Sequence, residues 1–211
     1  MCLAQRGYAV VNFTYRLAPK YKFPASLEDT NLVFRWVLDH ASEYGFDSDH
    51  IFAVGDSAGA HMLGLYSNLC TNPDYAARFS FRPPEGFAPT AVSLSCGVYE
   101  ITLGGKKDLT ARLMADLLPN KGSAAELETV SVLRHVTANF PPSFIMTANN
   151  DFLRDAAPPM AEKLKALGVP VRFELYGDEQ NPLGHVFHCD IRTQAAARCN
   201  EDECSFFRSR L

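Results

Sequence analysis

A strand and a helix are predicted to meet with almost no connecting residues between positions 50 and 70. The run HIFAVG (50–55) is apolar and β-branched, which predicts a buried strand, and the segment at 57–70 has the composition of a helix with small residues near its start. The chain must therefore turn sharply within Gly55-Asp56-Ser57-Ala58-Gly59. We expect this turn to hold Ser57 in a strained backbone conformation, with room on either side that only glycines leave.

Strands alternate with helices along most of the chain. Further buried strands are predicted at 7–16, 90–96, 142–148 and 171–176. Helices are predicted at 27–44, 158–167 and 190–207. This alternation is typical of an α/β fold, with a mostly parallel sheet, helices on both faces and right-handed crossovers.

One domain accounts for the whole length of 211 residues. Within the domain 1–211, residues 97–140 are interpreted as a small helical, lid-like insertion with helical patches at 109–118 and 124–133. The apolar side chains of this insertion are expected either to cover an acyl pocket or only to pack an added helix pair. They are Tyr99, Leu103, Leu113, Met114 and Leu117.

Composition excludes several classes of partner. The net charge is −4 and no Lys/Arg cluster is present, so nucleic acid is not expected to bind. No apolar run reaches membrane-spanning length, and no signal peptide is recognised, so a cytoplasmic protein is expected. The six cysteines are scattered without close pairs, which predicts reduced thiols, no metal site and no cofactor.

The turn at 55–59 matches the pattern G-x-S-x-G, in which the serine is a nucleophile. Ser57 begins a helix, whose free N–H groups suit the negative charge that develops during acyl transfer. A serine nucleophile needs a base to take its proton and a carboxylate to orient that base.

Candidates for the acid and the base follow the last two predicted strands. Asp151 and Asp155 come just after the strand at 142–148, and His185 and His188 lie in the loop after the strand at 171–176. Sites in open α/β sheets gather at the carboxyl ends of strands, so these loops are expected to converge on Ser57. Either aspartate can be the acid, unless both only cap the next helix, and either histidine can be the base.

Four segments resemble one branch of a known family. NFTYRLAPKYKFPASLEDT (12–30), GDSAGAHM (55–62), DFLRD (151–155) and GHVFH (184–188) occur in the expected order. They are similar to the motifs of the hormone-sensitive-lipase-like, acetyl-esterase branch of the α/β-hydrolases. The resemblance implies that Asp151 is the acid, that His185 is the base and that the Ala58 N–H is an oxyanion donor.

The same resemblance implies hydrolysis of short acyl, acetyl-type esters of a small molecule by a Ser-His-Asp triad. A serine peptidase and a catalytically weak scaffold are the alternatives. His61 resembles a family position with a structural role, so a packed, hydrogen-bonded imidazole is expected there. Tyr15-Arg16 with Asp29 is interpreted as fixing the loop beneath the site rather than performing chemistry, because arginine stays protonated.

The chain departs from the family pattern near its start. The family has an HGG-type oxyanion loop before the YRLAP segment. In the family's sheet, the strand that leads into this loop lies between the strand corresponding to residues 7–16 and the strand corresponding to residues 50–55. This sequence does not contain the loop, so we expect an N-terminally truncated or alternatively started form, with reduced activity. We expect either a rearranged sheet or a partner in the gap, and an exposed edge that favours a homo-oligomer.

Overall fold

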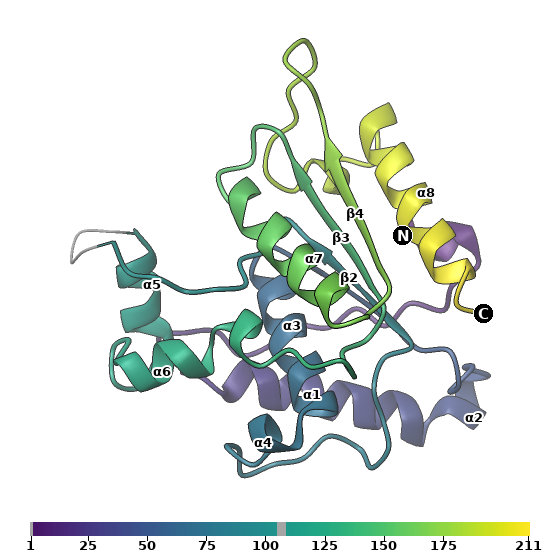
Figure 1. Cartoon of the computed structure of the whole chain (residues 1–211). Coiled ribbons are helices and arrows are strands. Elements are labelled where there is room, and N and C mark those ends of the chain that lie inside the picture. The colour runs from purple at the N-terminus through teal and green to yellow at the C-terminus, as the bar shows by residue number, and fades with distance from the viewer. Residues whose placement is uncertain (1, 105–108) are drawn as a thin grey trace.

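The computed structural model describes residues 2–104 and 109–211. Its described strands form one sheet in the order β1-β2-β3-β4, with every neighbouring pair parallel. The strands are β1 (Phe52–Asp56), β2 (Ala91–Ser95), β3 (Ser143–Ala148) and β4 (Val171–Tyr176) (Figure 1). The predicted α/β fold is confirmed, and each of these strands lies within two residues of its expected range.

The central strands are apolar throughout because both of their faces are covered. Val92 and Leu94 of β2 join one hydrophobic cluster, whereas Ala91 joins a second cluster on the opposite face. In β3, Ile145 faces the first cluster and Phe144 the second. Alternate residues of a strand point to opposite faces, so such a sequence has no polar alternation.

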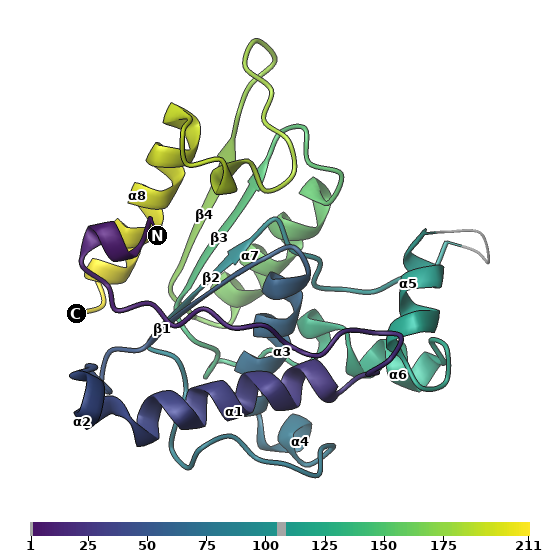
Figure 2. The same cartoon turned by 180° about the vertical axis from the view of Figure 1, so that it is seen from behind.

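Helices cover both faces of the sheet. On one face α3 (Ala58–Thr71) packs against β1 and β2, and α7 (Ala157–Ala166) packs against β3 and β4. The opposite face is covered by α8 (Gln194–Arg208), which contacts β4 and lies beside the N-terminal segment (Figure 2). Short 3-10 turns, η1 (Ala4–Arg6), η2 (Val132–Arg134), η3 (Arg154–Ala156) and η4 (Phe187–Cys189), connect these elements.

The helix predicted at 27–44 is divided in two. α1 (Ala25–Asp39) packs on α3, and α2 (Ala41–Tyr44) follows after a break at His40. Gly45 ends α2 in the left-handed conformation at φ 68°, which glycine adopts without strain. A further short helix, α4 (Pro73–Ala76), follows α3.

The insertion forms a helix pair beside the sheet, α5 (Leu109–Leu117) and α6 (Ala124–Thr129) (Figure 1). Residues 105–108 of the insertion lie outside the described residues. Tyr99 is fully buried and Met114 nearly so, both in the core, whereas Leu103 and Leu113 are exposed. These positions favour packing of an added helix pair over a roof on an acyl pocket.

The predicted strand at 7–16 is wrong. From Tyr8 the chain runs as an irregular segment with no strand pairing, and Val10 and Val11 are 43% and 39% exposed. Figure 2 shows the segment passing β1 and α3 on its way to α1. Among the described residues β1 pairs with β2 alone, so its other edge is open. A groove lies between that edge and this segment, and the segment therefore has no strand within hydrogen-bonding distance.

A groove of about 910 Å³ separates this segment from β1, α1 and α3. Residues on its two sides include Val11 and Val54, and Ser57 lies among its lining residues. Among the described residues, no helix has the length and apolar character needed to cross a membrane.

Candidate active site

Ser57 sits in the sharp turn between β1 and α3. Its φ is 52° and its ψ is −116°, an unfavourable conformation for a residue with a side chain. The Ser57 N–H donates to the Ser95 carbonyl at 2.9 Å, which ties the turn to the end of β2. The predicted strain at Ser57 is therefore present.

The two glycines of the turn have different roles. A Cβ at Gly55 would lie 2.5 Å from the Gly59 carbonyl oxygen, a distance that no backbone atom can accommodate. A Cβ at Gly59 would meet nothing within 4 Å. The expectation that both positions need glycine is correct for Gly55 and wrong for Gly59, because the strand passes close to the helix on one side only.

Three side chains from three loops meet at the carboxyl edge of the sheet. His185 Nε2 lies 2.9 Å from Ser57 Oγ, and His185 Nδ1 lies 2.8 Å from Asp151 Oδ1. Asp151 follows β3, and His185 follows β4 in a loop that a bridge between Asn150 and Gly184 holds beside the acid. The geometry is that of a nucleophile, a base and an orienting carboxylate.

The alternative candidates lie elsewhere. Asp155 points to solvent, with a side chain 89% exposed, and pairs with Arg154. His188 is buried in η4 and contacts the Cys189 thiol rather than Ser57. Of the two aspartates and two histidines left open by the sequence, the structure brings Asp151 and His185 to the serine.

Neighbouring groups keep Asp151 ionised. Burial alone would raise its pKa, but the Leu153 N–H, the Cys96 thiol and His185 stabilise the carboxylate, so the pKa lies below its usual value. The Leu153 N–H donates at 2.8 Å and the Thr147 hydroxyl donates to the other oxygen at 3.1 Å.

Sequence reasoning missed Thr147 and Cys96. Cys96 follows β2 at a positive φ of 51°, which brings its thiol to Asp151 and His185. Burial raises the pKa of Cys96 to about 12, so the thiol keeps its proton and can donate it to the carboxylate. The only signal in the sequence was the position of Cys96 at the carboxyl end of a predicted strand.

Ala58 is the first residue of α3, so its N–H is one of the terminal groups that have no partner in the preceding turn. Ala58 and Gly59 line the groove beside Ser57. A ligand in that groove therefore meets the serine and the positive end of the helix together.

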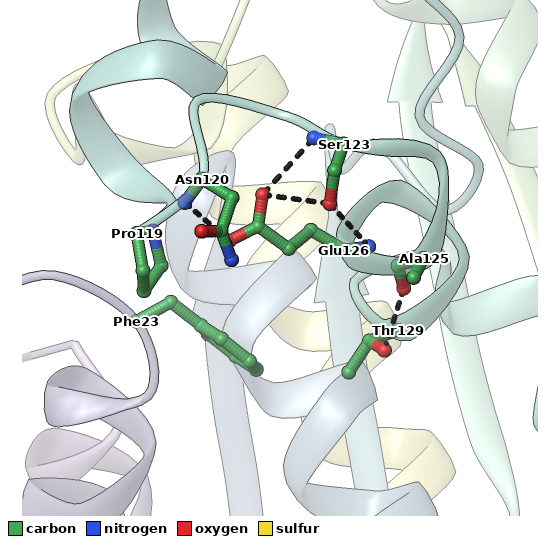
Figure 3. A pocket seen from close by; sticks show the side chains of 7 residues that line it. All are labelled: Phe23, Pro119, Asn120, Ser123, Ala125, Glu126 and Thr129. Carbon is green, nitrogen blue, oxygen red and sulfur yellow. Dashed lines mark hydrogen bonds between the residues drawn. The ribbon is translucent and has the colours of Figure 1, made fainter.

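A smaller cavity of about 280 Å³ lies between α6 and Phe23 (Figure 3). Its main polar group, Glu126, accepts hydrogen bonds from the N–H groups of Asn120 and Ser123 in a capping box. These bonds occupy the carboxylate in closing the turn before α6. The Ser123 hydroxyl also donates to Glu126, at 3.1 Å, and this contact belongs to the same capping box.

The two structural roles expected near the site are present. His61 Nε2 lies 2.7 Å from the Val130 carbonyl oxygen, and burial lowers the pKa of this imidazole. Arg16 donates from its guanidinium and its backbone N–H to Asp29, at 2.8 and 2.7 Å. His61 thus joins α3 to the insertion, and the Arg16–Asp29 pair fixes the N-terminal segment on α1.

A parallel α/β sheet with a nucleophile elbow between a strand and a helix defines the α/β-hydrolase class of proteins. The chain belongs to the family described as alpha/beta hydrolase fold, whose model matches residues 3–188. This confirms the resemblance found in the sequence.

Named relatives and solved structures agree with that membership. The chain is 30% identical over 161 residues to the probable carboxylic ester hydrolase LipM of Mycobacterium tuberculosis, covering 72% of this chain and 36% of that protein. It is 32% identical over 173 residues to the carboxylesterase NlhH of the same species, covering 77% and 52%. A crystal structure of esterase B from Lactobacillus rhamnosis superposes with a TM-score of 0.88 at 25% identity, covering 99% of this chain and 69% of that one.

The chain spans about a third to a half of the length of these two curated relatives. Their names describe those longer proteins.

Proposed function

We propose that this protein is a serine carboxylesterase that hydrolyses short acyl, acetyl-type esters through an acyl-enzyme. One observation carries the proposal: the continuous hydrogen-bonded series from Ser57 Oγ through both nitrogens of His185 to Asp151, with distances of 2.9 and 2.8 Å. The esterase names of the relatives support the choice of an ester as substrate.

In the proposed mechanism Ser57 Oγ attacks the ester carbonyl carbon while His185 Nε2 takes the hydroxyl proton. The tetrahedral intermediate collapses, the C–O bond to the alcohol breaks, and His185 gives the proton to the leaving oxygen. Water then attacks the acyl-serine with His185 again as base, and the carboxylic acid leaves. Asp151 remains ionised throughout and stabilises the imidazolium.

The Ala58 N–H is the proposed donor to the oxyanion. It lies at the N-terminus of α3, where the helix dipole adds to the hydrogen bond. One such donor contributes about 2.7–4 kcal/mol to stabilisation of the transition state.

A preference for short acyl chains is supported by the names and titles of similar proteins. One relative, 27% identical over 177 residues, is a versiconal hemiacetal acetate esterase from Dothistroma septosporum. Esterase B from Lactobacillus rhamnosis, 25% identical in its solved structure, has been crystallised with a tributyrin phosphonate inhibitor. Acetate and butyrate esters are therefore the first substrates to test.

The test compares hydrolysis of p-nitrophenyl acetate, butyrate and decanoate by the purified chain and its Ser57→Ala variant. We expect activity on acetate and butyrate, little on decanoate, and loss of activity in the variant. A fluorophosphonate probe should label the unaltered chain and a Ser80→Ala control, because Ser80 is exposed and does not line the groove that contains Ser57.

Equal rates for the unaltered chain and Ser57→Ala would contradict the proposal. So would labelling of the Ser57→Ala variant by the probe, since the reactive group would then be another residue.

A further inference from the structure

We propose that Asp56, His188 and Cys189 form a binding site for a zinc-like divalent cation beside the triad. Asp56 is the last residue of β1, and His188 and Cys189 end η4. One ligand atom from each residue lies within 4.8 Å of the other two. Sequence spacing had predicted no metal site, and it could not detect this one because Asp56 is far from the other two residues along the chain.

The donor set fits zinc better than calcium or magnesium. Carboxylate, imidazole and thiolate are the three kinds of side chain that zinc binds, whereas calcium and magnesium prefer oxygen ligands alone. The Cys189 Sγ and His188 Nε2 atoms are 3.8 Å apart. Two such ligands on a tetrahedral zinc ion lie about 3.5 Å apart, so only a small adjustment is needed.

His188 provides a second, independent observation. His188 is 9% exposed, and its Nδ1 atom is buried without a hydrogen-bond partner among the described residues. The Nε2 atom has only the long contact to the Cys189 thiol. A buried imidazole without a strong hydrogen bond on either nitrogen is unusual, and a cation bound to Nε2, the nitrogen that faces the Cys189 thiol, would give this ring one strong interaction.

The position of His188 is fixed by its surroundings. The Asn200 side chain donates to the His188 carbonyl oxygen at 3.1 Å and holds the residue in place. The ligand is thus positioned before any cation arrives.

Cys189 is more exposed than the other cysteines of the chain. Of the six cysteines, Cys189 is exposed, Cys2 and Cys70 are partly exposed, and the other three are buried. On binding, the S–H bond breaks, the proton passes to solvent and the thiolate bonds to the cation.

Under the proposed function, a cation at this site should inhibit hydrolysis. His188 and His185 are close enough for their charges to interact, and Asp56 immediately precedes Ser57. His185 must accept a proton during acyl transfer, and a nearby divalent cation opposes that positive charge. This step rests on the proposed esterase activity, whereas the binding itself does not.

The test titrates the full chain with Co²⁺, followed by the thiolate-to-cobalt charge-transfer band, and with Zn²⁺ by calorimetry. The variants are Cys189→Ser, His188→Asn and Asp56→Asn, with Cys96→Ser and Cys2→Ser as controls. We expect one cation per chain, loss of the band in Cys189→Ser, and affinity at least about 100-fold weaker in the three site variants. The controls should bind as the unaltered chain does.

No binding by the unaltered chain at millimolar Zn²⁺, or a band that persists in Cys189→Ser and disappears in Cys96→Ser, would overturn the proposal. Cys189→Ser replaces one exposed atom, and its circular dichroism should match that of the unaltered chain, so a folding defect is distinguishable. If the esterase is active, Zn²⁺ should inhibit the unaltered chain and spare Cys189→Ser. Binding without any esterase activity would refute the proposed function and leave the cation site standing.

Discussion

The Nδ1 atom of His185 lies 2.8 Å from Oδ1 of Asp151, and the Asp151 side chain has no exposed surface. The carboxylate thus faces the imidazole without competition from bulk water. This arrangement selects the tautomer of His185 that carries its proton on Nδ1 and leaves Nε2 free to accept from Ser57.

Replacement of the acid should therefore lower catalysis without loss of the fold. We expect Asp151→Asn to lower kcat for p-nitrophenyl acetate by roughly 10³–10⁴-fold, because the amide favours the wrong tautomer. The measurement is steady-state hydrolysis, with circular dichroism to show that the variant is folded.

Asp155→Asn is the matched control. Its carboxylate is exposed and pairs with Arg154, so kcat should change less than twofold. A larger loss in Asp155→Asn than in Asp151→Asn would show that Asp155 is the working acid.

Alanine substitutions at the two glycines of the turn, Gly55 and Gly59, should change the free energy of unfolding in opposite directions. Gly55→Ala places a Cβ against the Gly59 backbone and should lower the free energy of unfolding by about 2–4 kcal/mol. Gly59→Ala has open space and lies in α3, where alanine is favoured over glycine by about 0.5–1 kcal/mol. Urea unfolding of both variants tests the pair, and equal destabilisation would show that Gly59 also needs its hydrogen.

Much of the fold was predictable because the four strands of the sheet are buried on both faces or lie next to such strands. A continuous apolar run bounded by turns has few other places in a folded protein. The positions of Asp151 and His185 were predictable for a related reason, since parallel strands end at one edge. The sequence alone could not choose between Asp151 and Asp155, because that choice depends on the direction of each side chain after the strand ends.

The run at 7–16 shows the limit of such reasoning. Its composition favours a strand, but strand formation needs a neighbour whose free backbone groups lie within hydrogen-bonding distance, and a groove separates this run from β1. Periodicity along the chain does not report that distance. Cys96 and Thr147 were missed for a similar reason. Cys96 follows a different strand from Asp151, and Thr147 reaches Asp151 only because the chain turns back at the end of β3. Single-sequence patterns report neither contact.

Phe152 should contribute to catalysis rather than to stability. Phe152 is 75% exposed, and the centroid of its ring lies 4.4 Å from the centroid of the His185 ring. The two rings are tilted by 44°, and aromatic pairs stabilise one another by about 0.5–1.5 kcal/mol, so loss of the phenyl ring should free the imidazole and lower kcat about 2–10-fold. Phe152→Ala should therefore lose activity with unfolding unchanged, and Phe152→Tyr should restore it; equal rates in all three proteins would contradict this role.

Glu203 is a buried carboxyl group on α8 that the proposed mechanism does not use. It is 5% exposed, and burial raises its pKa to about 7, although Ser93 and Arg6 offset part of the effect. An unfolded glutamate has a pKa of about 4.3, so the folded state binds this proton more tightly. The stabilisation is complete below about pH 4.3 and is lost as the pH rises to about 7.

Glu203→Gln should remove this pH dependence, because the amide stays neutral. The unaltered chain should lose about 3 kcal/mol of unfolding free energy relative to the variant between pH 4.5 and pH 8. The measurement is urea unfolding of both proteins across that range, since their difference cancels the titration of the histidines. Glu201→Gln is the control on the same helix: Arg208 and Arg6 lower the pKa of exposed Glu201, so its loss should leave the slope between pH 5 and 8 unchanged. A difference between the unaltered chain and Glu203→Gln that stays constant with pH would mean that Glu203 is already ionised in the folded protein at pH 5, with a charged partner compensating for its burial.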